Sequence, residues 1–244
     1  MEQAQLLAQR GSSKITRKEL KGISTPPAST THQPIPHDEI VGALAETLSF
    51  RQISVVREEY AVSRDGMKMF GVLDLETTFE GCRFSIGVRN SNDKSMRLAL
   101  TVGYRVLVCD NMAFHGDFTP VLAKHTKHLS LIDILAVGVD RMQRNFEPMR
   151  KQVEGWKGTR LADEAAKLVI YRAFVEGGLD VPRHLARRVH DLYFAPIAGE
   201  FAPRTTWSLS NAFTSAFKEL DPIPQFKATA KLASFLERAT PAAC

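Results

Sequence analysis

The stretch from Cys82 to Cys109 constrains the fold most, because two segments within it alternate apolar with polar or small residues. Successive side chains of a β-strand point to opposite faces, so this period of two predicts two strands with one buried and one exposed face. The set expected to be buried is Cys82, Phe84, Ile86, Val88, Met96, Leu98, Leu100, Val102, Tyr104, Val106 and Val108. The opposite face is expected to carry Arg83, Arg89, Arg97 and Arg105, with small neighbours and no acidic residue.

A flat basic face of this kind suits a polyanion, most directly the phosphate backbone of nucleic acid. The joining turn adds Asn90, Asn92 and Lys94, which we expect to line the end of a groove. On the outer face of a later helix, Arg141 and Arg144 could extend the surface. The alternative interpretation is an ordinary solvated face whose arginines keep the sheet soluble.

Further extended segments precede this pair, at about 52–63 and 67–78, and the pair itself covers about 82–90 and 96–109. Gly66 and Gly81 lie between consecutive segments and readily take the positive φ of a tight turn. Short turns imply antiparallel neighbours, because parallel strands need long crossovers.

Helical periodicity begins after the strands. Apolar residues recur at steps of three and four from Ile132 to Val153, which predicts a helix of about 24 residues. Shorter helices are expected at about 38–48, 161–176, after Asp180, and at 205–219 and 225–238. Strands followed by helices, without alternation, predict an α+β fold: an antiparallel β-meander, then a long helix and a C-terminal helical portion.

The 244 residues, 44% of them hydrophobic, are enough for one substantial core. We expect one α+β domain over 38–244, with its sheet portion at about 50–118 and its helical portion at about 128–238. Residues 1–37, which are basic and rich in Pro, Ser and Thr, are expected to form a disordered tail.

Three scattered cysteines, the absence of a signal-peptide pattern and the absence of an apolar run of roughly 18 residues favour a cytoplasmic protein with no membrane contact. The net charge of +5 permits an anionic partner.

No glycine-rich phosphate loop, dinucleotide fingerprint or Gly-x-Ser-x-Gly elbow occurs, so no cofactor and no catalytic residue is predicted. Two weaker candidates for metal chemistry remain open. One is a zinc site built from Cys109, His115, His125 and His128. The other is a nuclease-like cluster drawn from Glu58, Glu59, Asp74 and Glu76.

Several segments carry a family resemblance: Arg89 to Ser95, Val108 to Phe114, Lys124-His125-Thr126 and Thr206 to Thr214. In this order they resemble a family of phages, plasmids and prophages that is catalogued as domain of unknown function 932. The last segment, Trp207 to Asn211 with the following Ala and Thr, is similar to that family's tryptophan–asparagine–alanine–threonine pattern. The resemblance implies a mobile-element setting, and the expected outline is similar to that of single-strand annealing proteins.

We therefore expect a mobile-element accessory protein that binds single-stranded DNA non-specifically, with possible strand annealing in recombination and self-association into an oligomer. The main alternative is a module that uses the same basic face against an acidic host protein. A metal-dependent nuclease is the third hypothesis.

Overall fold

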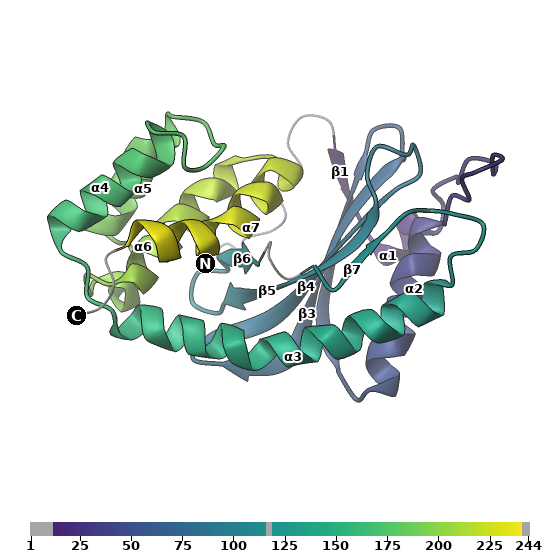
Figure 1. The fold of residues 1–244 in the computed structure, drawn as a ribbon, viewed down its shortest axis with the longest axis horizontal. Helices are drawn as coiled ribbons and strands as arrows, with labels where there is room; N and C mark the ends of the chain where they lie inside the picture. Colours follow the sequence, from purple (N-terminus) through teal and green to yellow (C-terminus); the bar gives the residue numbers. More distant parts are fainter. Residues whose placement is uncertain (1–11, 116–118, 241–244) are drawn as a thin grey trace.

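The computed structural model describes residues 12–115 and 119–240. Its strands are β1 (Ser12–Ile15), β2 (Val55–Ser63), β3 (Lys68–Phe79), β4 (Cys82–Ser91), β5 (Leu98–Val106), β6 (Met112–Phe114) and β7 (Val121–Ala123). Its α-helices are α1 (Arg17–Leu20), α2 (His37–Phe50), α3 (Leu131–Gly158), α4 (Asp163–Phe174), α5 (Leu185–Phe194), α6 (Thr206–Ala216) and α7 (Pro222–Ala239). The predicted α+β order, an antiparallel sheet followed by a long helix and further helices, is confirmed (Figure 1).

All strand pairs in the sheet are antiparallel, in the order β1-β2-β3-β4-β5-β6, with β7 also pairing with β5. The turns before β3 and β4 contain Gly66 and Gly81 at φ values of 69° and 76°, as their positions predicted. Strand β5 ends at Val106, earlier than expected, because the chain turns there and Asp110 donates its backbone N–H to the Val106 carbonyl.

The first face of the sheet is the predicted apolar one, and α2 and α3 pack against it (Figure 1). The Phe84 ring of β4 stacks on Phe146 of α3 with ring centroids 4.0 Å apart. Gly138 lets α3 approach β7 closely, since a Cβ there would lie 2.3 Å from a Val121 methyl. Helix α3 has 28 residues and continues through Pro148.

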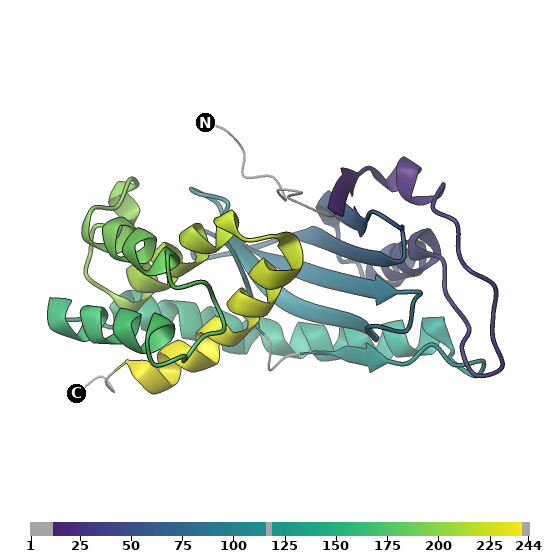
Figure 2. The ribbon, with the colours of Figure 1, turned by 90° about the horizontal axis from the view of Figure 1, so that it is seen from above.

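The second face, which was expected to be exposed, is largely covered. Strand β6 places the Phe114 ring over the central strands, where a Cβ at Gly103 would lie 2.7 Å from this ring. Phe114 contacts Phe70 of β3 and Phe226 of α7, with ring centroids 6.2 Å and 5.1 Å away. The expectation of an open face was therefore wrong: every residue of β5 is buried, because α7 and β6 form a second apolar layer on this side. Figure 2 shows α7, in yellow, lying across the strands on this side of the sheet.

Part of the expected N-terminal tail is ordered. Residues Ser12–Ile15 pair with β2, and α1 follows with a capping box between Thr16 and Glu19. Leu20 is fully buried in the main core. The prediction of a disordered tail was thus wrong for this segment, because its few apolar side chains reach the sheet; residues 1–11 lie outside the described ranges.

The sheet and the C-terminal helices are joined by a buried polar contact. The Asn111 side-chain amide, just before β6, donates to both the backbone carbonyl and the side-chain oxygen of Asn211 in α6, each at 3.1 Å. Trp207 of the same helix packs near Tyr104 of β5. Two segments of the family resemblance, a hundred residues apart in sequence, thus meet at one place. Among the described helices, none is long and apolar enough to cross a membrane.

Candidate nucleic-acid interface

Arg105 lies in a buried ion-pair network on the second face. Its guanidinium Nε is 2.7 Å from Asp74 of β3, and Nη2 donates to Glu59 of β2 at 3.1 Å. The Ser85 hydroxyl donates to the other oxygen of Asp74 at 2.6 Å. The expectation that this face holds no acid and that Arg105 contacts phosphates was wrong, because β2 and β3 supply carboxylates to the same face and the arginine is only 2% exposed.

Arg83 and Arg89 are half-buried on this face, and neither forms an ion pair in the described part of the chain. The Arg89 guanidinium lies over the Phe226 ring, 5.9 Å from its centroid. Burial lowers the pKa of Arg89, since no carboxylate compensates for the water that it has lost. These two arginines are cationic but only partly accessible.

Asn90 and Asn92 do not line a groove, because both side chains are buried. The Asn90 amide donates to the Ile35 carbonyl and lies 2.9 Å from His37 Nδ1, while the Asn92 side-chain oxygen accepts the Ile35 N–H. The Asn92 carbonyl lies 3.1 Å from His32 Nε2. The two asparagines therefore anchor the segment before α2 against the turn after β4, and this anchoring positions His32.

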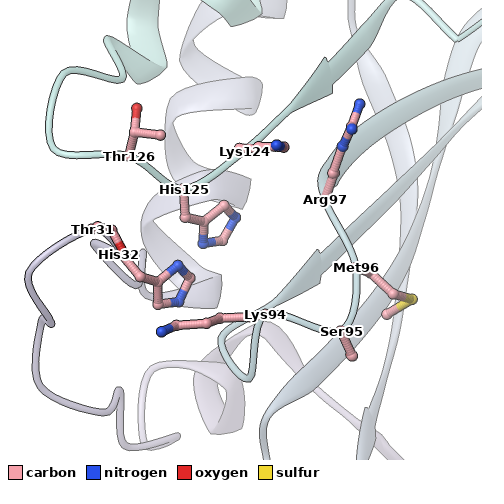
Figure 3. Close-up of a pocket in the computed structure, with 9 residues that line it drawn as sticks. All are labelled: Thr31, His32, Lys94, Ser95, Met96, Arg97, Lys124, His125 and Thr126. Carbon is pink, nitrogen blue, oxygen red and sulfur yellow. The ribbon is translucent and has the colours of Figure 1, made fainter.

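A pocket of about 350 Å³ opens beside the turn that follows β4 (Figure 3). Three segments that are distant in sequence form it, and we call it the cationic pocket: Thr31, His32, Lys94, Ser95, Met96, Arg97, Lys124, His125 and Thr126. No acidic residue is in this lining, and its three cations form no ion pair with any described residue. The nearby Asp93 carboxylate is turned to Lys68, at 3.5 Å.

Two cations of the cationic pocket lie just beyond the paired ends of the neighbouring strands β5 and β7. The β5–β7 ladder pairs Leu98 with Ala123, so its register brings Arg97 opposite Lys124. In Figure 3 the Lys124 side chain extends toward Arg97. Like charges directly opposite on neighbouring strands repel each other, and a bound anion between them would remove this repulsion.

Two stacked imidazoles are part of the lining of the cationic pocket. The rings of His32 and His125 lie 5.4 Å apart at an angle of 3°. His125 is 5% exposed, and neither of its ring nitrogens has a hydrogen-bond partner among the described residues. Burial, together with the neighbouring His32 and His37, lowers the pKa of His125 to about 4, so its ring is neutral at pH 7.

Arg141 and Arg144 lie on the exposed side of α3, which packs on the first face of the sheet. Arg141 donates to the Pro120 carbonyl at 3.5 Å, and Arg144 donates to the Asp140 carbonyl at 3.3 Å. The prediction that Arg141 and Arg144 extend the basic surface was wrong, since that surface lies on the second face and the sheet separates these two residues from it.

The proposed metal ligands are not brought together. Within residues 12–115 and 119–240, no group of three His, Cys, Asp or Glu side chains could hold a metal ion. His125 lines the cationic pocket, whereas the Tyr104 ring packs near His115 and the Cys109 carbonyl accepts a hydrogen bond from Lys218. Of the four candidate carboxylates, Glu59 and Asp74 bind Arg105, Glu58 accepts from Tyr60, and Glu76 is exposed.

The sequence thus identified Lys94 and Arg97 of the cationic pocket, but it missed Thr31, His32, Lys124 and Thr126 as members of one site. The segment Lys124 to Thr126 was part of the family resemblance, and so was the turn that ends at Ser95. No protein-family model matches the chain, and the searches of curated proteins and of solved structures gave no match.

Proposed function

We propose that this protein binds nucleic acid through its phosphate backbone, with the cationic pocket as the principal contact and single-stranded DNA as the preferred partner. In the mobile-element setting that the resemblance implies, such binding would serve strand annealing during recombination, by an oligomer of this chain. Neither catalysis nor a cofactor is needed for this role.

One observation carries the proposal: Lys94, Arg97 and Lys124 surround a single pocket that no carboxylate lines. Side chains of this type, contributed by loops at the end of a sheet, are the usual donors to phosphate oxygens. The half-buried Arg89 adds to the positive potential at the cationic pocket, because it lies on the same face of the sheet as Arg97. Its register partner on β5 is Ala99, two residues from Arg97. The rest of the second face contributes little to this potential, since Glu59 and Asp74 neutralise Arg105.

The size of the cationic pocket favours a single strand over a duplex. A cavity of about 350 Å³ holds roughly one phosphate with its sugar. A flexible strand can direct one phosphate into such a cavity, whereas duplex phosphates lie on a stiff, convex cylinder. We therefore expect a weaker, shallower contact with duplex DNA.

The test is fluorescence anisotropy with labelled single-stranded and duplex DNA across a salt series, comparing the double variant Arg97→Ala/Lys124→Ala with the wild type. Binding should weaken by about tenfold or more at low salt, and the log–log salt slope should fall by about 0.7 for each single-strand phosphate contact that is lost.

The matched control is Arg183→Ala/Arg187→Ala, which removes the same net charge from two exposed positions, one just before α5 and one in its first turn. It should leave the slope nearly unchanged. Equal effects of the two double variants would contradict a localised site. Absence of DNA binding by the wild type at low salt would reject the proposal and favour an acidic protein surface as the partner of the cationic pocket.

A further inference from the structure

We infer that a bound single strand continues from the cationic pocket across the ends of β7, β5, β4 and β3, over a line of basic side chains on the second face. We call this line the basic row; it consists of Lys124, Arg97 and Lys68. The inference rests on the proposed function and specifies the path of the strand, with Lys68 as a contact outside the pocket.

The strand registers place the basic row on one face of the sheet. Lys68 pairs with Ser91 across β3 and β4. Extending the β4–β5 register by two residues from the pair Arg89 and Ala99 brings Arg97 across from Ser91. Residues directly opposite each other on antiparallel strands share a face. One line across the ends of four neighbouring strands is therefore formed by Lys68, Ser91, Arg97 and Lys124.

Helix α7 does not cover the basic row. In Figure 2, α7 crosses the strands near the helical portion, and the strands continue beyond it toward α1, in purple. Arg97 and Lys124 are exposed, and Lys68 is half-buried. The side chain between Lys68 and Arg97 is the small Ser91, which allows a backbone to approach the sheet closely. The row is thus accessible to a polymer lying across the strands.

The charge along the basic row favours a polyanion. Among the described residues, Asp93 provides the one carboxylate within 4 Å of the row, at 3.5 Å from Lys68. The other oxygen of Asp93 accepts from the Ser91 hydroxyl and from the Ser95 N–H. A long ion pair between partly exposed groups is weak, so a phosphate can share Lys68 with Asp93. The half-buried Arg89 lies beside the row on the same face and adds positive potential.

The length of the basic row distinguishes a strand from a small anion. Neighbouring strands lie about 4.8 Å apart, so the three steps from Lys124 to Lys68 cover roughly 14 Å. A single phosphate cannot contact both ends of this distance. A stacked strand carries one phosphate per ~3.4 Å of its axis, so the row spans at most about four successive phosphates. Cations that follow the backbone in this way are typical of single-strand binding without sequence preference.

The test is fluorescence anisotropy of the full-length protein with a labelled oligothymidylate long enough to cross the row, over a salt series. Lys68→Gln should weaken binding about threefold at low salt and lower the log–log salt slope by about 0.7, as the loss of one phosphate contact predicts.

Asp93→Asn should act in the opposite direction and strengthen binding about threefold, because it removes the negative charge beside Lys68. Asparagine keeps a side-chain oxygen that can accept from Ser91 and Ser95, so the turn after β4 retains these hydrogen bonds. Misfolding cannot produce such a gain in affinity.

The matched control is Lys167→Gln, which also removes a lysine paired with a carboxylate, Glu164 at 2.7 Å, but on α4 of the helical portion. It should change neither the affinity nor the slope. If Lys68→Gln and Asp93→Asn bind like the wild type while Arg97→Ala/Lys124→Ala binds weakly, the path is overturned and the proposed function stands. Stronger competition by polyglutamate than by an unlabelled strand would overturn nucleic acid as the occupant of the row. A wild-type protein that binds no DNA at low salt would reject the proposed function itself.

Discussion

Arg97 and Arg105 share one face along the same run of sequence, but their neighbours give them different roles. Arg105 has Glu59 and Asp74 beside it and is withdrawn from solvent. Arg97 lies just before β5, opposite Lys124, and remains exposed in an acid-free pocket. A charged side chain on a strand can therefore be assigned a role only when the residues across from it on both neighbouring strands are known.

Replacing Arg105 by methionine should destabilise the fold strongly. The change leaves Glu59 and Asp74 buried without their counter-charge, and breaking a buried ion pair in this way costs about 3–5 kcal/mol. The free energy of unfolding from urea titration measures the loss. The control is Arg150→Met, which removes an exposed arginine paired with Glu147 and should cost less than about 1 kcal/mol. Similar losses in both variants would show that the Arg105 network adds no more stability than a surface pair.

Stability should fall on acidification, in part through His125. Its pKa is about 4 in the folded protein and 6.5 when unperturbed, so below pH 6.5 the unfolded chain binds a proton that the folded chain does not. This contribution is fully present above pH 6.5 and is lost as the pH falls toward 4. The burial of His37, whose pKa is also lowered, acts in the same direction.

The measurement is urea unfolding of the wild type and His125→Gln at pH 7 and pH 4.5. The wild type should lose about 2 kcal/mol more than the variant over this interval, less than the full linkage value since the pocket admits water. Identical losses would mean that His125 is accessible enough to take up a proton in the folded state.

At the scale of elements, the sequence predicted the strands and helices whose apolar periodicity is long. The alternation correctly assigned the first-face residues of β4 and β5 themselves, and the recurrence from Ile132 to Val153 predicted α3. It was wrong for Val108, which is 53% exposed, and for the half-buried Met96, because both lie beyond the ends of β5. The second layer was missed for a physical reason. Strand β6 has three residues, too few for a periodic signal, and its partner Phe226 lies more than a hundred residues further along the chain.

The candidate site was only partly predictable for a related reason. Lys94 and Arg97 lie within the stretch that the alternation singled out, whereas His32 and Lys124 reach the same pocket from loops on either side of the sheet segments. What brings them together is the β5–β7 register and the anchoring by Asn90 and Asn92, and neither has a local sequence pattern.

Helix α7 should depend on Phe226 for its attachment to the sheet. This ring contacts both Phe70 and Phe114, so Phe226→Ala removes the centre of the second apolar layer and should cost about 3–5 kcal/mol. Phe50→Ala, at a position 87% exposed, is the matched control and should change stability by less than about 0.5 kcal/mol. Urea unfolding compares the two, and a small loss at Phe226 would mean that α7 is held mainly through α4 and α6.

At the scale of the whole molecule, the sheet portion and the helical portion are tied by both buried and exposed contacts. Asn111 binds Asn211, Trp207 lies near Tyr104, and Lys157 of α3 donates to the Glu80 carbonyl at 2.6 Å. These ties cross between segments that are far apart in sequence. They make independent unfolding of the helical portion unfavourable, because it would expose buried polar and aromatic groups of the sheet.

The chain should therefore unfold in one transition. Both tryptophans, Trp156 and Trp207, lie in the helical portion, so their fluorescence reports on that portion, while far-UV circular dichroism reports on all helices and strands. In a urea titration the two signals should give the same midpoint, as two-state behaviour requires. Separate midpoints would divide the chain into two folding units.

The ion pairs of Arg105 have a consequence for how the sheet finds its alignment. A slip of β5 by one residue against β4 would exchange its two faces, moving Arg105 into the aliphatic layer beneath α3 and leaving Glu59 and Asp74 without a cation. Gly87 and Gly103 oppose the same slip, because the Phe114 ring packs against both positions and a Cβ there would lie 2.9 Å or 2.7 Å from it. The buried ion pairs therefore favour one register of β5 against β4. In a shifted register the buried charges would lack their partners, so the mispaired sheet would be unstable even before β6 and α7 cover it.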